Sequence, residues 1–175
     1  MKGIHKALRR RKRNAGAAAI ELAAVLPLML LFLMGTIDIV DMYMEERRML
    51  RATSNMADLI ARQNEMDSDK LDDIAAASQT VFRPLGGAPA SFGVSEVRFD
   101  DDGDASVGWT ASVEGGTVND PVAETSGIDL RSSSVIVVEG RFTWTPQFLS
   151  GLIGDVRLSE TAVARPRVVN RIPFR

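Results

Sequence analysis

A single glutamate interrupts a stretch of 23 otherwise uncharged residues, Ala15 to Ile37. A carboxylate in apolar surroundings is costly unless it is paired or hydrogen-bonded, so Glu21 must find a partner or reach a polar boundary. The residues before it are small, from Asn14 to Ala19, and a proteolytic cut among them would remove the basic residues and leave a new ammonium group near the start of the stretch. A neighbouring chain shifted by about one helical turn could then pair this ammonium with Glu21.

The stretch is long enough to cross a membrane. As a helix, its 23 residues span about 34 Å, and a hydrocarbon core is about 30 Å thick. Pro27 lies inside it, where a kink is tolerated in a membrane. Pro27 is explained either by an ordinary kinked anchor or by a point at which the helix bends when it leaves lipid.

Basic residues precede the span. The first thirteen residues hold seven Lys and Arg and no acid. Such a run can bind nucleic acid, but beside a span the positive-inside rule explains it better. Only Arg47, Arg48 and Arg51 follow closely on the other side. We therefore expect a cytoplasmic N-terminus, an exported remainder and no nucleic-acid partner.

Composition excludes several chemistries. The 175 residues include no cysteine, so disulfide and thiolate chemistry are excluded. The one histidine, His5, lies in the basic leader. A histidine-dependent triad or metal site is therefore excluded for a mature form without the leader, and no cofactor is expected.

A secretory signal fits poorly, because no small-x-small cleavage site follows the apolar stretch. The letters G-AAAIE-LAAVLP, residues 16–27, instead resemble the N-terminus of TadE-like pseudopilins, the minor pilin-like components of Tad/Flp tight-adherence pili. The resemblance implies that a prepilin peptidase cuts after Gly16 and that Glu21 stands at the fifth mature position. Leu22 departs from the pattern, since an aromatic residue commonly follows this glutamate.

The resemblance also implies function and partners. It describes a non-enzymatic minor pseudopilin that takes part in assembly of an adhesive pilus. Its partners would be the prepilin peptidase, the major Flp pilin and other pseudopilins, the inner-membrane assembly platform and membrane lipid. The protein would be single-pass in the bacterial inner membrane. The alternative is a permanently anchored envelope protein whose outer domain binds a ligand; an anchored enzyme is a weaker rival.

The sequence as a whole predicts an α+β fold with four parts: a basic leader (1–16), a transmembrane and extended helix (17–66), a second helix and linker (67–90), and an antiparallel β-rich domain (91–175). An apolar stripe from Met42 to Ala61 either packs on the chain's own domain or forms a seam between helices. Ser68 is expected to cap the second helix. Strands are predicted at 91–99, 105–113, 134–145 and 156–167, with loops at 114–134 and 146–155.

Alternation in the second strand places Val107, Trp109, Ala111 and Val113 on one face. Trp109 and Trp144 are expected in the core rather than on a ligand platform. The resemblance extends to the closing strands, where an alternating strand ends in T-P and the last ends in R-P-R.

Two further groups of charged residues allow more than one interpretation. Acids at Asp100, Asp102 and Asp104 match half of a calcium loop, but Ala105 and Ala111 occupy the positions of its glycine and bidentate glutamate, so a hairpin turn is the better interpretation. The basic C-terminal edge, which includes Arg165, Arg167, Arg171 and Arg175, is expected to be a solvated tail or a contact for an acidic partner.

Overall fold

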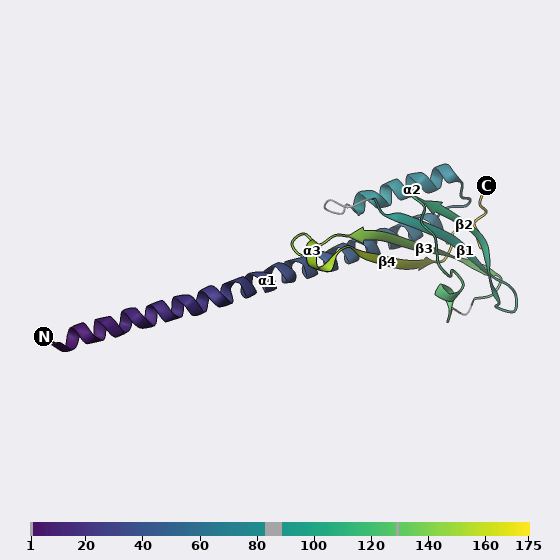
Figure 1. The fold of residues 1–175 in the computed structure, drawn as a ribbon. Coiled ribbons are helices and arrows are strands. Elements are labelled where there is room, and N and C mark those ends of the chain that lie inside the picture. Colours follow the sequence, from purple (N-terminus) through teal and green to yellow (C-terminus); the bar gives the residue numbers. More distant parts are fainter. Residues whose placement is uncertain (1, 83–88, 129) are drawn as a thin grey trace.

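The computed structural model (Figure 1) describes residues 2–82, 89–128 and 130–175, with side chains from Ala19 onward except that of Val81. Its elements are α1 (Lys2–Ala61), α2 (Ser68–Val81), β1 (Ser91–Phe99), β2 (Ala105–Val113), a 3-10 turn η1 (Ala123–Thr125), β3 (Ser133–Trp144), α3 (Ser150–Ile153) and β4 (Val156–Ala164). This confirms the predicted α+β arrangement of a long apolar helix, a short second helix and an antiparallel sheet. Most of the linker predicted between the second helix and residue 91 lies outside the described residues.

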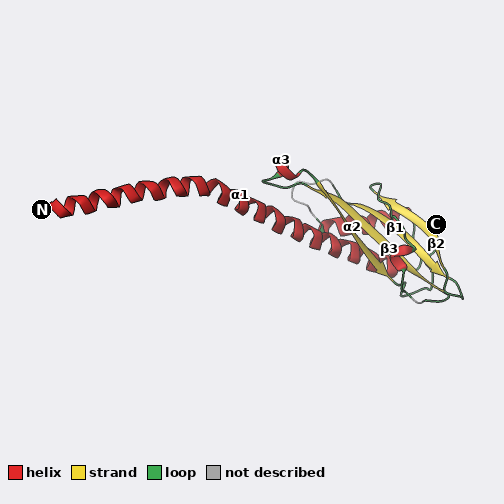
Figure 2. Cartoon of the chain, turned by 60° about the horizontal axis from the view of Figure 1, so that its bottom comes forward, coloured by secondary structure: helices red, strands yellow, loops and turns green. Residues whose placement is uncertain are grey.

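Helix α1 has 60 residues and so is about 90 Å long. Only its C-terminal part packs on the sheet, while the N-terminal part projects freely (Figure 1). Pro27 lies in the projecting part without ending the helix, and α1 bends before it reaches the sheet (Figure 2). No glycine or proline occurs from Thr36 to the end of α1, so nothing in the sequence breaks it there.

Helix α1 ends at Ala61, earlier than the predicted residue 66. The helix ends here because backbone groups after Ile60 form hydrogen bonds with the C-terminal segment of the chain. The Arg167 N–H donates to the Ala61 carbonyl (2.8 Å), and Met66 forms an isolated parallel bridge with Phe174. The cap of α2 also differs from the prediction. Asp67, not Ser68, is the N-cap, and its carboxylate accepts from the Lys70 N–H (2.8 Å).

The four strands pair antiparallel in the order β2-β1-β3-β4. Strand β3 begins and ends one residue before the prediction, and β4 stops before Arg165-Pro166, where proline cannot donate to a ladder. A bulge in β2 at Gly108 makes Trp109 pair with Glu96 and Val107 with Val97. The extra residue moves Val107 to the opposite face from Trp109, so their predicted common face is wrong and Val107 is 45% exposed.

The main core lies between one face of the sheet and the two helices (Figure 2). The apolar stripe of α1 supplies its centre, with Met49, Met56 and Ile60 fully buried, while Leu59 stays 36% exposed. Gly140 of β3 faces α1, where a Cβ would overlap the Met49 and Thr53 side chains. The stripe therefore packs on the chain's own domain. Trp144 is buried in this core and Trp109 packs against it, as predicted.

Residues 114–128 and 130–132, which belong to the loop predicted at 114–134, cover the other face of the sheet. Val118, Val122 and Leu130 from this segment pack on a second cluster formed by the sheet residues Val97, Phe99, Val135 and Val137. The approach is close, because a Cβ on Gly93 of β1 would overlap the backbone of Thr117 and Val118. The segment is thus a covering layer rather than a solvated loop.

Candidate membrane and assembly site

The projecting part of α1 exposes its apolar side chains. From Ile20 to Ile37 the large apolar residues are between 37% and 73% exposed, and the helix is long and apolar enough to cross a membrane by length and composition. Glu21 is exposed among them, and no ion pair between described side chains involves it. The backbone at Gly16 and Ala17 is helical, and their surroundings lie outside the described side chains.

A buried aspartate joins the apolar part of α1 to the domain. Asp38, the first charge after Glu21, is 1% exposed and accepts from three consecutive backbone N–H groups. Gln147 donates to Oδ1 (3.0 Å), Leu149 donates to Oδ2 (2.8 Å), and Phe148 is shared between both oxygens (3.2 Å each). Charge-assisted bonds of this kind are strong, so Asp38 clamps the 146–155 loop onto α1. Sequence analysis did not identify Asp38.

Asp38 is the first of three acids on one face of α1, since Asp41 and Glu45 follow at helical spacing. Asp41 accepts from the Trp144 indole N–H (3.1 Å). Glu45 is buried and pairs with Arg48 (2.5 Å), as its spacing allowed, while its second oxygen has no hydrogen-bond partner. Acids at i, i+3 and i+7 that directly follow a span were a detectable sequence signal.

Two glutamates at the contact between α1 and the sheet, Glu45 and Glu160, have pKa values raised above the ordinary one. Burial raises the pKa of Glu45, and the neighbouring Arg48 only partly opposes this. Burial also raises the pKa of Glu160 on β4, helped by the adjacent Glu46 carboxylate, while Arg47 acts in the opposite direction. Both shifts arise where α1 meets the sheet, so protonation is linked to the packing of this contact.

The sign of this linkage predicts a pH dependence. Because the folded pKa values of Glu45 and Glu160 lie above the ordinary 4.5, their contribution favours folding below that pH. It is lost as the pH rises through the raised values. We expect Glu160→Gln to flatten the fall of the thermal midpoint above pH 4.5, measured on the full chain in detergent. Glu124→Gln, at an exposed position on η1, is the control; equal slopes for the two variants would contradict the assignment.

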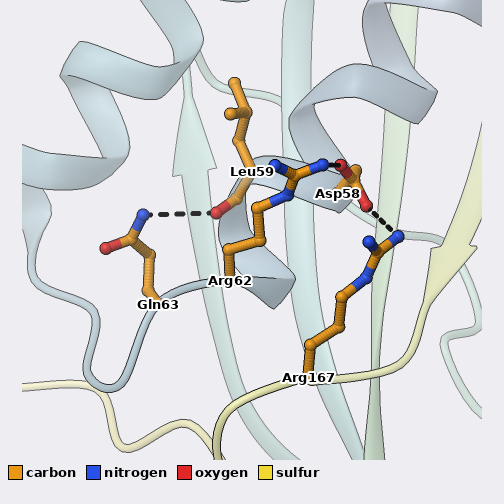
Figure 3. Close-up of polar contacts among 5 residues, drawn as sticks. All are labelled: Asp58, Leu59, Arg62, Gln63 and Arg167. Carbon is orange, nitrogen blue, oxygen red and sulfur yellow. Dashed lines mark hydrogen bonds and ion pairs between the residues drawn. The ribbon is translucent and has the colours of Figure 1, made fainter.

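Two of the C-terminal arginines, Arg167 and Arg175, pair with acids of the chain itself. Figure 3 shows Asp58 of α1 between the guanidinium groups of Arg62 (2.5 Å) and Arg167. In the same view the Gln63 side chain donates to the Leu59 carbonyl (3.3 Å). Arg175 pairs with Glu65 (3.4 Å). Arg167 and Arg175 thus form exposed ion pairs between the C-terminal segment and residues at or just after the end of α1.

The acidic turn of the β1–β2 hairpin uses its first carboxylate internally. Asp100 Oδ1 accepts from the backbone N–H groups of Asp102 (3.0 Å) and Asp104 (2.8 Å). Among the described residues, no group of three acids or histidines is placed to hold a metal ion. The geometry is that of the predicted hairpin turn.

A long helix with an exposed apolar half, clamped by a buried acid to a small antiparallel α+β domain, is the architecture expected of a single-pass membrane protein with a folded domain at one end. Residues 16–58 match the family model described as TadE-like protein, which confirms the resemblance over this segment and indicates a protein associated with Tad pili. The matched range begins at Gly16 and includes Glu21, Pro27 and Asp38. The likeness of the C-terminal strands lies outside it and stays a prediction. No curated protein and no solved structure matches the chain.

Proposed function

We propose that the chain is a minor pseudopilin in assembly of a Tad/Flp-type adhesive pilus, and that a prepilin peptidase processes it after Gly16. The observation that carries the proposal is the apolar segment in the projecting part of α1, residues 19–37, which is exposed and carries Glu21 as its only charge. The TadE-like match covers this part. Because the stripe from Met42 to Ala61 is used by the domain, the surface left for neighbouring pilins is the projecting part.

The partners in this proposal are the peptidase, the major Flp pilin, other pseudopilins and the inner-membrane assembly platform. In the membrane, lipid surrounds the apolar half of α1; in a filament, the apolar helices of neighbouring subunits replace the lipid. Pro27, which lacks a backbone N–H, is the point at which we expect α1 to adjust between the two environments.

Cleavage at Gly16 tests the proposal directly. In cells with an active prepilin peptidase, we expect the wild-type protein to begin at Ala17, as read by mass spectrometry of the purified protein. Gly16→Leu should trap the full-length form because a bulky side chain blocks the cut. Gly3→Leu, the same change elsewhere in the leader, should leave processing unchanged. A mature wild-type protein that still carried residues 1–16 would support the permanently anchored alternative instead.

The orientation has its own test. Seven Lys and Arg precede the apolar stretch and only three follow closely, so the N-terminus should stay in the cytoplasm. A reporter that is active only outside the cytoplasm, fused after Arg175, is therefore expected to be active. Replacing the seven basic residues by glutamine should reduce that activity. A stable but inactive wild-type fusion would reverse the proposed orientation.

A further inference from the structure

The 146–155 loop carries an apolar surface that the domain does not cover. Leu152 is 77%, Ile153 55% and Phe148 45% exposed, although each lies in or next to α3. The fourth apolar residue, Leu149, turns the other way, and its Cδ1 lies 3.3 Å from where a Cβ on Gly35 of α1 would be. One side of the loop is thus fixed to α1 and the other is exposed.

The position of the loop along α1 identifies what this surface faces. Gly35 lies three residues before Asp38, about 4.5 Å toward the N-terminus, within the last turn of the apolar segment. Leu149 therefore reaches the level of the membrane span rather than that of the sheet. In Figures 1 and 2, α3 lies at the end of the domain nearest the projecting part of α1. The exposed side chains continue the apolar surface of α1.

Several backbone N–H groups of the loop form hydrogen bonds within the protein and so do not need water as a partner. The amides of residues 147–149 donate to Asp38, and those of Leu152, Ile153 and Gly154 donate to carbonyls within the loop. At the base of the loop, the Thr145 hydroxyl donates to Asp155 (2.8 Å). Each of these satisfied N–H groups lowers the cost that the loop would meet in lipid.

We propose that the α3 loop inserts Phe148, Leu152 and Ile153 into the membrane interface, in the leaflet next to the domain. The occupant is lipid rather than a second chain, because the surface is continuous with the span and stands at its depth. The loop is then a second membrane contact, and together with α1 it fixes the tilt of the domain over the bilayer. This inference requires only that α1 spans a membrane and does not depend on processing or pilus assembly.

The chain has no cysteine, so Leu152→Cys provides a unique site for a polarity-sensitive fluorophore. The full chain is reconstituted at one protein per vesicle in phosphatidylcholine and phosphatidylglycerol, with nitroxide quenchers attached to the lipid near the headgroup. We expect the label at 152 to be quenched several-fold more than one at Ser126→Cys, an exposed position beside η1. Ile153→Cys repeats the measurement at a neighbouring exposed position.

Two results would overturn the inference. Equal lipid quenching at 152 and 126, with both labels equally open to aqueous iodide, would place the loop in water. Protection of the label at 152 that appears only at high protein density, and without lipid quenching, would show that another subunit covers the loop. Circular dichroism of each labelled variant confirms that the helix and sheet are retained.

Discussion

Glu21→Leu is expected to insert and to be cut normally, yet to be incorporated into the pilus about a hundred-fold less than wild type. Cleavage would leave an ammonium on Ala17, four residues before Glu21 on α1, a rise of about 6 Å. A neighbouring subunit shifted by about one turn could pair the two charges. Removing one partner of a buried pair costs about 3–5 kcal/mol, which accounts for a loss of this size.

The measurement is co-purification of the variant with the other pilins and with sheared filaments. Glu21→Gln, which keeps the shape but not the charge, should fail in the same way. Glu124→Leu, the same change at an exposed position on η1, is the control and should be incorporated normally. Normal incorporation of processed Glu21→Leu would show that the carboxylate only reaches to the membrane interface, and the pairing would then be abandoned.

Asp38→Ala is expected to release the α3 loop from α1 and to lower the free energy of unfolding by about 3 kcal/mol, because three backbone amides lose a charged acceptor at a buried site. Hydrogen exchange on the full chain in detergent should show the amides of residues 147–149 protected in the wild type and exchanging rapidly in the variant. Hydrogen exchange in the apolar segment of α1 should be the same in the variant and the wild type.

Asp58→Ala is the control for this substitution, since Asp58 lies on the same helix and pairs with Arg62 and Arg167. These partners are largely exposed, so its loss should cost less than about 1 kcal/mol. It should also leave the amides of residues 147–149 protected. Fast exchange of those amides in the wild-type protein would contradict the clamp.

Much of the architecture follows from local sequence patterns. The length of the uncharged run predicts a span because it matches the thickness of a hydrocarbon core. The stripe from Met42 to Ala61 and the alternation of the strands reflect the periods of helix and strand, so they predict these elements without knowledge of the fold. The small residues around Gly16 and the lone Glu21 are also local signals, because they can be recognised without knowledge of distant residues. The β1 and β2 bounds and the burial of Trp144 agree with those predictions.

The tertiary structure decided what depends on segments far apart in the chain. Asp38 looks like an ordinary polar residue after a span, and it becomes a clamp only because Leu149, 111 residues later, lies beside it. The bulge at Gly108 places Val107 on the opposite face from the predicted one. Asp58 forms an ion pair with Arg167, which lies 109 residues later in the chain. Periodicity states which side of an element is apolar, but only the packed fold determines which distant amide or charge each side meets.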